Sequence, residues 1–436
     1  MKVAFFTLGC KVNQYESQFL MQQFKKNGFE VVASEEIADV YIINSCTVTS
    51  TGDKKTRQII HRLKTLNQNA LIVLTGCFPQ AFPEDAKKIS EADIITGTKN
   101  RKEIYNIVID KLGNNLRNEE RVHIYDNEKD KTFEAMSVEK FDGKIRAFIK
   151  IQDGCNRFCS YCIIPKARGR VRSKSLNAIK HEAEKLALNG HKEIVFTGIN
   201  LSSYGQDLEN VRLVDAAEVV AKIDGIKRVR FSSLEPELLT IDDVKRLKLI
   251  DEFCPHFHLC LQSGCNATLK RMNRHYSTEE YFEIVNMIRD NFDNVAVTTD
   301  LMVGFPGETD EEFKETINFI KKVNFAQMHV FAYSKRPGTR AALMHGQVEN
   351  KIKKRRSFEV IKIANEMQEN FLNSQIGSTL EVLFETEYIH NYYQGHSKNY
   401  LNVIVKSDEN ICGKIKNVKI VDVDAQKKHC IGVLDE

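Results

Sequence analysis

The feature that most constrains this chain is a loop of three cysteines, Cys155, Cys159 and Cys162, with the spacing Cys-x3-Cys-x2-Cys. A closed tetrahedral zinc site uses one more ligand than this loop supplies, and the next cysteine downstream is the distant Cys254. A [4Fe–4S] cluster held by three cysteines keeps one iron free to bind a substrate or cofactor. The cysteine loop, as we call these three residues, therefore favours an iron–sulfur site over structural zinc.

The composition is that of a globular protein with reduced cysteines. The chain has 436 residues, enough for two to three domains, and a net charge of +4, too small by itself to indicate a polyanionic partner. Eleven cysteines without a disulfide-framework spacing indicate a reducing compartment. There is no signal-peptide pattern, and no apolar run approaches the ~18 residues of a membrane helix. We expect a soluble, cytoplasmic protein without membrane contact.

The N-terminal third predicts a parallel α/β sheet, because short apolar runs alternate with helical patterns. The predicted strands cover residues 3–8, 40–43, 71–74 and 93–96. Cys10, Cys46 and Cys77 each follow the carboxyl end of a strand, and these ends share one edge of a parallel sheet. We therefore expect these three cysteines, the N-terminal triad, to converge on a second cluster. The alternative is three unrelated buried cysteines, since free cysteine is often buried.

A second series of strand and helix patterns begins at residue 146. Its apolar runs cover residues 147–151, 194–196, 229–231, 257–261, 295–303 and 328–333. Six units predict a (βα)6 partial barrel rather than the eight of a full barrel, with the site at the carboxyl ends of the strands. The cysteine loop follows the first strand. Polar or glycine residues at the other strand ends are candidate cofactor ligands: Gly198, Ser233, Glu235, Gln262 and Asp300. Ordinary turn chemistry is the alternative for each of them.

The C-terminal part predicts a long helix at 349–374 and then a small β-barrel with strands at 380–385, 401–405, 418–423 and 430–434. We expect an N-terminal domain at 1–113, a linker at 114–143, the partial barrel at 144–345, a linking helix at 346–376 and the C-terminal barrel at 377–436. The remaining cysteines are expected to be structural: Cys254, Cys260, Cys265, Cys412 and Cys430.

Several motifs, spread over nearly the whole chain, resemble those of the radical S-adenosylmethionine (SAM) methylthiotransferases. They are residues 7–13 (TLGCKVN), 44–49 (NSCTVT), 75–77 (TGC), 154–169 (GCNRFCSYCIIPKARG), 232–236 (SSLEP), 261–264 (LQSG), 272–276 (MNRHY), 304–309 (GFPGET) and 334–339 (SKRPGT). Cys260 and Ala332 depart from the family pattern without touching a cluster ligand. The resemblance implies an N-terminal α/β domain, a radical SAM partial barrel and a C-terminal TRAM β-barrel.

The resemblance also implies the chemistry. The cysteine loop would hold a [4Fe–4S] cluster whose open iron chelates SAM, with Arg274 added to the SAM-binding candidates above. The N-terminal triad would hold an auxiliary [4Fe–4S] cluster that carries the sulfur to be inserted. One SAM would methylate this sulfur, and another would yield the radical that activates a C–H bond. The implied partners are a tRNA anticodon stem-loop, an electron donor such as flavodoxin or ferredoxin, and a sulfur source.

Three branches of the family differ in substrate. Residues 47–49, 53–58 and 197–205 resemble the branch that acts on N6-threonylcarbamoyladenosine beside the tRNA anticodon. We expect residues 47–49 and 198–205 to line the target pocket. The alternatives are isopentenyladenosine in tRNA and an aspartate of a ribosomal protein. An alternative of another class is a non-catalytic iron–sulfur or zinc protein that binds RNA.

Basic residues near both cysteine sites are candidate RNA contacts: Lys54, Lys55, Arg57, Lys166, Arg168 and Arg170. A solvated surface is the alternative for either patch. The C-terminal barrel is acidic, since residues 378–436 contain seven lysines, no arginine and nine acids. If it binds RNA, it does so through a local face or through bases stacked on its tyrosines: Tyr388, Tyr392, Tyr393 and Tyr400.

Overall fold

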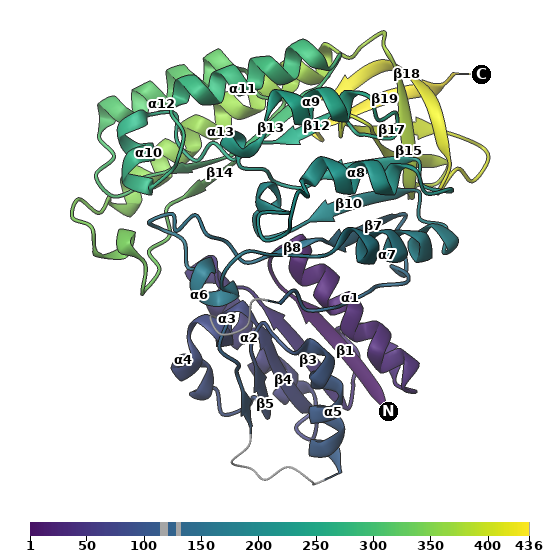
Figure 1. Ribbon diagram of the computed structural model, residues 1–436, viewed down its shortest axis with the longest axis vertical. Coiled ribbons are helices and arrows are strands. Elements are labelled where there is room, and N and C mark those ends of the chain that lie inside the picture. Colours follow the sequence, from purple (N-terminus) through teal and green to yellow (C-terminus); the bar gives the residue numbers. More distant parts are fainter. Residues whose placement is uncertain (114–120, 128–131, 436) are drawn as a thin grey trace.

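Six parallel strands form the N-terminal sheet in the computed structural model, which describes residues 1–113, 121–127 and 132–435 (Figure 1). Their order is β2-β1-β3-β4-β5-β6, with bounds β1 Lys2–Thr7, β2 Glu30–Val32, β3 Val40–Ser45, β4 Leu71–Gly76, β5 Ile94–Thr96 and β6 Val122–His123. β3 is buried along its whole length, as expected for a parallel strand covered on both faces. The helices are α1 Lys11–Lys26, α2 Ser50–Leu66, α3 Cys77–Ala81, α4 Pro83–Lys87 and α5 Arg101–Leu112.

The strand order places the N-terminal triad at a topological switch point. β1 lies between β2 and β3, so the chain reverses its direction of winding between β1 and β3. In open α/β sheets ligands bind in the crevice at the carboxyl ends of the strands at such a point. Cys10 follows β1, Cys46 follows β3, and Cys77 opens α3 directly after β4. The predicted α/β fold of this part is confirmed.

The central part is an open barrel of six parallel strands. β7 (Arg146–Lys150), β10 (Glu193–Thr197) and β11 (Arg228–Phe231) form one sheet; β12 (His256–His258), β13 (Ala296–Val303) and β14 (Gln327–Ala332) form another. Parallel bridges from Val229 to Phe253 and from Leu234 to Leu259 join the two sheets. A short two-stranded ribbon of β8 (Gln152–Asp153) and β9 (Arg172–Ser173) flanks the cysteine loop. The predicted (βα)6 partial barrel is therefore confirmed.

Amphipathic helices cover this barrel. They are α7 Leu176–Leu188, α8 Leu213–Ala221, α9 Ile241–Lys248, α11 Thr278–Asn291, α12 Asp310–Val323 and α13 Asn350–Asn373, with the shorter α6 Ile164–Arg168 and α10 Asn266–Met272 and the 3-10 turns η1 Leu201–Ser203, η2 Pro236–Leu238 and η3 Arg340–Leu343. Capping boxes begin α11 at Ser277 and α12 at Thr309. α13 buries Val360 and Met367 in the main core, so the helix expected to be a linker also serves as the sixth covering helix.

The segment expected to link the first two domains packs against the folded parts of the protein. Met136, Val138 and Phe141 are buried in the main core, and β6 extends the N-terminal sheet. Residues 114–120 and 128–131 of this expected linker lie outside the described residues.

The C-terminal barrel closes from five strands in the order β15-β16-β17-β19-β18. They are β15 Thr379–Ile389, β16 Tyr392–Ser397, β17 Asn402–Lys406, β18 Ile415–Asp424 and β19 His429–Leu434. The sequence missed β16, because its residues YYQGHS form no apolar run. Arg146 and Arg228 begin β7 and β11 and bond to Glu385 and Glu381 of β15. The C-terminal barrel thus lies at the amino ends of these strands, opposite the edge that carries the cysteine loop (Figure 1).

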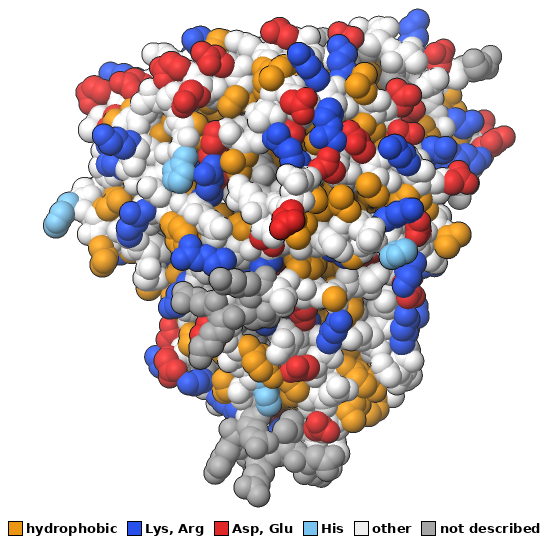
Figure 2. Space-filling view, in the orientation of Figure 1, with side chains coloured by type: hydrophobic (Ala, Val, Ile, Leu, Met, Phe, Trp, Pro, Cys, Tyr) orange, Lys and Arg blue, Asp and Glu red, His pale blue; other side chains and the backbone are white. Residues whose placement is uncertain are grey.

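Charges of both signs intermingle on the face drawn in Figure 2, in keeping with the small net charge of +4. Among the described helices, none has the length and hydropathy of a membrane-spanning segment.

Candidate active site between two cysteine triads

The N-terminal triad comes together in space. Gly9, in the left-handed region with φ +103°, brings the backbone before Cys10 against Cys46: a Cβ at Gly9 would lie 2.8 Å from the Cys46 Cβ and 3.0 Å from its Sγ. Burial chiefly raises the pKa of both Cys46 and Cys77, and negative charge on Cys10 adds to this rise because the three thiols lie near one another. All three are free thiols. The structure thus brings these distant cysteines near one another, and their binding of a cluster stays a prediction.

Cys77 is the buried member of the N-terminal triad, and Arg168 contacts it. The Arg168 Nε donates a hydrogen bond to the Cys77 Sγ at 3.2 Å. Burial raises the pKa of the Cys77 thiol to about 11, although the Arg168 charge opposes this rise. Arg168 itself is 0% exposed, so its predicted role as an RNA contact is wrong: phosphate cannot reach it. Arg168 points into the protein, although it lies in a run of basic residues that has the pattern of a surface patch.

The cysteine loop is held by its backbone and by two neighbouring side chains. Gly154 has φ +72°, and a Cβ there would lie 1.8 Å from the Arg170 carbonyl oxygen, so only glycine fits. The Asn200 Nδ2 lies 3.7 Å from the Cys155 Sγ, and the Arg274 Nη1 lies 3.3 Å from the Cys159 Sγ. Burial raises the pKa of the Cys155 and Cys162 thiols. Asn200 belongs to the segment 198–205 that the sequence places near the site, and it contacts the cysteine loop.

Both triads fit iron–sulfur clusters better than single metal ions. Metal ligation requires thiolates, and a bound cationic iron core offsets the cost of ionising buried thiols. In the described part of the chain, the one group of three donor atoms within 4.8 Å of one another belongs to His258, Cys260 and Asp300. Neither triad, both of which lie in the described residues, brings its three sulfur atoms within that distance of one another, and a four-iron core is larger than a single ion. Three cysteines in each site would leave one iron open to another ligand.

A cavity of about 430 Å³ lies between the cysteine loop and the segment that follows Cys46. Val48 and Thr49, just after Cys46, line it from the N-terminal domain, and Cys162 lines it from the cysteine loop. The rest of its wall comes from the cysteine loop, the start of α6 and the carboxyl-end part of the barrel strands: Tyr161, Ile163, Ile164, Gln262, Asp300, Met302, Phe331, Ala332, Tyr333 and Ser334. Its volume is typical of small-molecule sites. The cavity therefore reaches Cys162 of the cysteine loop and the two residues that follow Cys46 and Thr47.

The polar groups of this cavity are arranged for recognition. Gln262 has φ +65° and a buried Oε1 without a hydrogen-bond partner in the structure. Asp300 lies 3.4 Å from the Nε2 of His258 and 3.3 Å from the Nδ1 of His329. Burial would raise the pKa of Asp300, but these two histidines outweigh it and hold the pKa well below its usual range. The cavity wall thus contains a carboxylate, Asp300, and the residue Gln262, whose buried amide oxygen has no hydrogen-bond partner.

The remaining cofactor candidates occupy different places. Arg274 forms an ion pair with Glu235, with the Nη1 and Oε1 atoms 3.1 Å apart, beside Cys159. Gly198 lies against the side chain of Gln152, and Ser233 is exposed. Contact of any of them with SAM stays a prediction.

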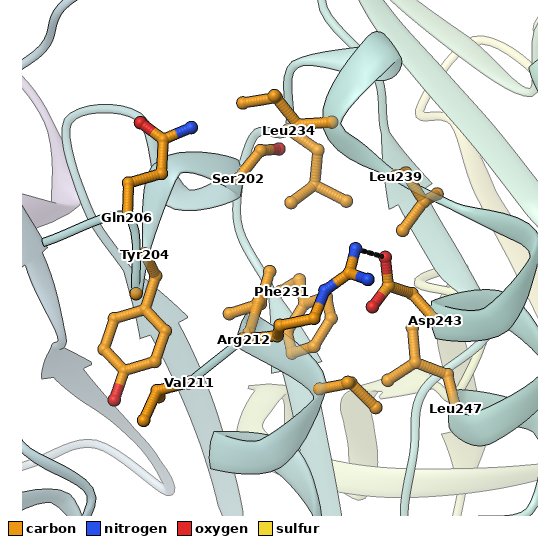
Figure 3. A pocket seen from close by; sticks show the side chains of 14 residues that line it. Ser202, Tyr204, Gln206, Val211, Arg212, Phe231, Leu234, Leu239, Asp243 and Leu247 are labelled. Carbon is orange, nitrogen blue, oxygen red and sulfur yellow. Dashed lines mark hydrogen bonds and ion pairs between the residues drawn. The ribbon is translucent and has the colours of Figure 1, made fainter. Parts of the chain in front are cut away.

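The segment 198–205 divides between two places. Asn200 faces the cysteine loop, whereas Ser202, Tyr204 and Gly205 line a separate hollow of about 200 Å³ on the outside of the barrel. Figure 3 shows this hollow, with leucines around it and an ion pair between Arg212 and Asp243. The expectation that residues 202–205 line the target pocket is wrong for the cavity between the triads.

The other basic candidates are exposed. Lys54, Lys55 and Arg57 project from α2, and Lys166 and Arg170 flank the cysteine loop. The Arg170 guanidinium lies 4.5 Å from the centre of the Phe158 ring, itself 40% exposed. Their contact with RNA stays a prediction.

Comparisons with known proteins agree with this geometry. Residues 149–320 match the Radical SAM superfamily, and residues 2–97 match Uncharacterized protein family UPF0004. The threonylcarbamoyladenosine tRNA methylthiotransferase MtaB of Bacillus subtilis is 40% identical over 427 residues, covering 96% of this chain and 93% of the relative. The MtaB of Aquifex aeolicus is 39% identical, covering 88% and 92%. The tRNA-2-methylthio-N(6)-dimethylallyladenosine synthase of Alkaliphilus oremlandii is 35% identical, covering 95% and 89%.

Among solved structures, the radical SAM methyltransferase TsrM from Kitasatospora setae matches with a TM-score of 0.59 at 14% identity, covering 78% of this chain and 76% of that one. This likeness supports the fold alone. The superfamily implies SAM and a [4Fe–4S] cluster, for which the cysteine loop has the right ligands. With two matched domains in order and relatives similar over almost their whole length, the chain belongs to the radical SAM methylthiotransferase family.

Proposed function

We propose that this enzyme inserts a methylthio group at C2 of N6-threonylcarbamoyladenosine, next to the anticodon of tRNA. The observation that carries the proposal is the single cavity bounded by Cys162 on one side and by Val48 and Thr49, after Cys46, on the other. A base held there lies between a site for SAM cleavage and a site for sulfur. Such an arrangement lets one carbon atom lose hydrogen and gain sulfur without leaving the cavity.

The proposed reaction breaks the C2–H bond and forms a C2–S bond. Bound SAM and two [4Fe–4S] clusters supply the hydrogen abstraction and the methylated sulfur. The hydrogen would leave in 5′-deoxyadenosine, a second SAM would supply the methyl group, and the electron used to cleave the first SAM would be returned when the C–S bond forms. A flavodoxin or ferredoxin would provide that electron, and a separate sulfur source would reload the auxiliary site.

The chain's own residues would select the base. Asp300, the unpaired Gln262 Oε1 and the Thr49 hydroxyl offer hydrogen bonds to a polar threonylcarbamoyl group, whereas Val48 and Met302 offer apolar walls to the adenine. Without that group the buried Gln262 Oε1 would stay unpaired, so an isopentenyl analogue should bind poorly. Among the relatives compared, those named for threonylcarbamoyladenosine are 37–40% identical to this chain, whereas those named for dimethylallyladenosine are 33–36% identical.

The cytoplasm is the compartment that fits this function. All eleven cysteines are free thiols, and oxidation of either triad would prevent it from binding iron.

Nucleoside mass spectrometry of tRNA from cells with and without the gene tests the substrate. We expect loss of 2-methylthio-threonylcarbamoyladenosine, with the isopentenyl product unchanged, and rescue by the wild-type gene but not by Cys155→Ala. Loss of the isopentenyl product, or of the ribosomal-protein modification, would instead assign the enzyme to another branch.

A simpler assay distinguishes this enzyme from a non-catalytic RNA-binding protein. The reconstituted enzyme with dithionite under anaerobic conditions should convert SAM to 5′-deoxyadenosine. A protein that binds iron and RNA but leaves SAM intact under these conditions would support the non-catalytic alternative.

A further inference from the structure

Arg168 reaches from the barrel into the N-terminal cysteine site. It ends α6, the short helix that begins at Ile164, just after Cys162. Its guanidinium donates to the Cys77 Sγ at 3.2 Å, to the Asn13 Oδ1 at 2.7 Å and to both carboxylate oxygens of Glu16, at 2.5 and 3.0 Å. The side chain is completely buried. A long, charged side chain is held in a single position by three partners from another domain.

We propose that Arg168 is a positioning residue of the N-terminal triad, which fixes the Cys77 sulfur and offsets the negative charge of the cluster held there. The inference rests on the proposed function, because it presumes an auxiliary cluster on Cys10, Cys46 and Cys77. It assigns to Arg168 a task inside the protein in place of a contact with RNA.

The charges around Arg168 call for an additional anion. In the described residues, the contact network contains four cations, Lys150, Arg101, Arg168 and Arg172. Its acids number three, Glu16, Asp153 and Glu134. A surplus buried cation is costly unless an anion compensates it. Thiolate ligands at Cys77 would supply negative charge directly against the guanidinium.

The cysteine loop shows the same arrangement. Arg274 donates to the Cys159 Sγ at 3.3 Å, and its guanidinium is ion-paired with Glu235. Each triad thus has one buried arginine bonded to one cysteine sulfur and anchored by one glutamate. The repetition at two unrelated places in the fold favours a functional role for both contacts over chance packing.

α6 also connects the two sites mechanically. Its start follows Cys162, and its end carries Arg168. On the way Ile163 and Ala167 pack against Cys77 and Ala81 of α3. The position of Cys77 therefore depends on the cysteine loop through these apolar contacts. The hydrogen bond from Arg168 to Cys77 adds a polar contact to them.

The test isolates the auxiliary site in the full-length chain by replacing Cys155, Cys159 and Cys162 with Ala. In this parent protein we compare Arg168→Gln and Arg168→Lys by redox titration followed by electron paramagnetic resonance, and by the rate of iron loss to a chelator. Arg168→Gln should lower the reduction potential and speed iron loss about tenfold, the usual scale when a hydrogen bond to a metal ligand is removed. Arg168→Lys should restore most of the potential but not the iron retention.

Arg172→Gln is the matched control. Arg172 is buried in the same network, 3.6 Å from Asp153, and donates hydrogen bonds to the carbonyl oxygens of Arg168 and Arg170. None of these partners is a sulfur atom. Glu16 keeps Arg101 and Lys150 when Arg168 is replaced, so the Gln variant should fold. Unchanged potential and retention in Arg168→Gln, or an equal change in Arg172→Gln, would overturn the role of Arg168. A parent without any cluster would instead remove the auxiliary cluster, and this inference with it.

Discussion

At the residue scale, the six triad cysteines should separate into two functional classes. Replacing Cys155, Cys159 or Cys162 with Ala should abolish SAM cleavage, because the cluster that binds SAM would no longer form. Replacing Cys10, Cys46 or Cys77 should leave SAM cleavage and abolish methylthio insertion. The measurements are anaerobic 5′-deoxyadenosine formation, product mass and iron content, with about eight irons in wild type and about four in each class, as two four-iron clusters require.

Cys254→Ala provides the control for this prediction, because Cys254 is buried in the barrel core as a free thiol outside both triads. It should retain both activities and all the iron. Wild-type protein that saturates at about four irons would contradict the second cluster.

Single residues also show where sequence reasoning stops. The cysteines can be placed because each follows a strand end, and parallel strands bring those ends together. Arg168 cannot, because Lys166 and Arg170 beside it are exposed and give the run the pattern of a surface patch. The buried Arg168 is paired with Glu16, which lies 152 positions earlier in the chain. A local pattern carries no information about such a partner.

At the scale of elements, strands with continuous apolar runs can be predicted and polar ones cannot. β3 and β10 are buried throughout, and their residues alone are enough to place them. β16 alternates buried positions with exposed or half-buried ones and is rich in polar and small residues, so only closure of the C-terminal barrel reveals it. The sequence places the segment after β10 at the target pocket, but the turn η1 carries Ser202 and Tyr204 toward the hollow in Figure 3.

The exposed face of α2 should guide RNA to the cavity. α2 begins at the cap residue Thr49, which lines the cavity, and carries Lys54, Lys55 and Arg57 on its solvent side. Replacing all three with Ala should weaken tRNA binding and reduce the slope of log K against log salt by ~0.7–0.9 for each phosphate that these side chains neutralise. Titrations at several salt concentrations measure both effects, and SAM cleavage without RNA should not change.

Lys314→Ala with Lys321→Ala is the control for α2. These exposed lysines lie on α12, on the far side of the barrel from α2 (Figure 1). Their removal should leave the salt slope unchanged. Equal slopes for wild type and the α2 variant would mean that this face is only solvated.

At the scale of the whole molecule, Glu16 joins the N-terminal domain to the barrel. Burial disfavours its charge, yet Arg101, Arg168 and Lys150 outweigh burial and hold the pKa of Glu16 at about 2, against an ordinary 4.5. Glu16→Gln should destabilise the apo-protein by about 3–5 kcal/mol at neutral pH, because three cations lose their common partner. Urea unfolding measures this difference. Asp142→Asn should cost less than ~1 kcal/mol, since the ion pair of Asp142 with Lys25 is exposed.

The same interaction has a defined pH dependence. The pKa of Glu16 is lower in the folded protein, so its stabilising effect is complete above about 4.5 and is lost as the pH falls toward about 2. The difference between wild type and Glu16→Gln should therefore shrink with acid over this range. A difference that stays constant from pH 7 to pH 2 would show that Glu16 is not the titrating group.

The C-terminal barrel is the part whose role depends most on its position. Tyr400 stacks between His256 and His396, with ring centres 4.7 and 4.8 Å apart, so it belongs to the interface with the central barrel and is not open to a base. Tyr393 is buried in the core of the C-terminal barrel. Of the four candidate tyrosines, Tyr388 and Tyr392 remain exposed, at 44% and 37%.

Tyr388 and Tyr392 lie together at the β15–β16 hairpin, where an acidic domain can still bind RNA by stacking. Replacing both with Ala should weaken tRNA binding by ~1–3 kcal/mol for each base that stacks, with an unchanged salt slope, because no charge is removed. Weaker binding with an unchanged salt slope distinguishes the two tyrosines from the basic residues of α2. Val421→Ala with Val433→Ala, equally exposed on β18 and β19, is the control and should bind normally. If the tyrosine variant also binds normally, the C-terminal barrel does not contact RNA through this hairpin.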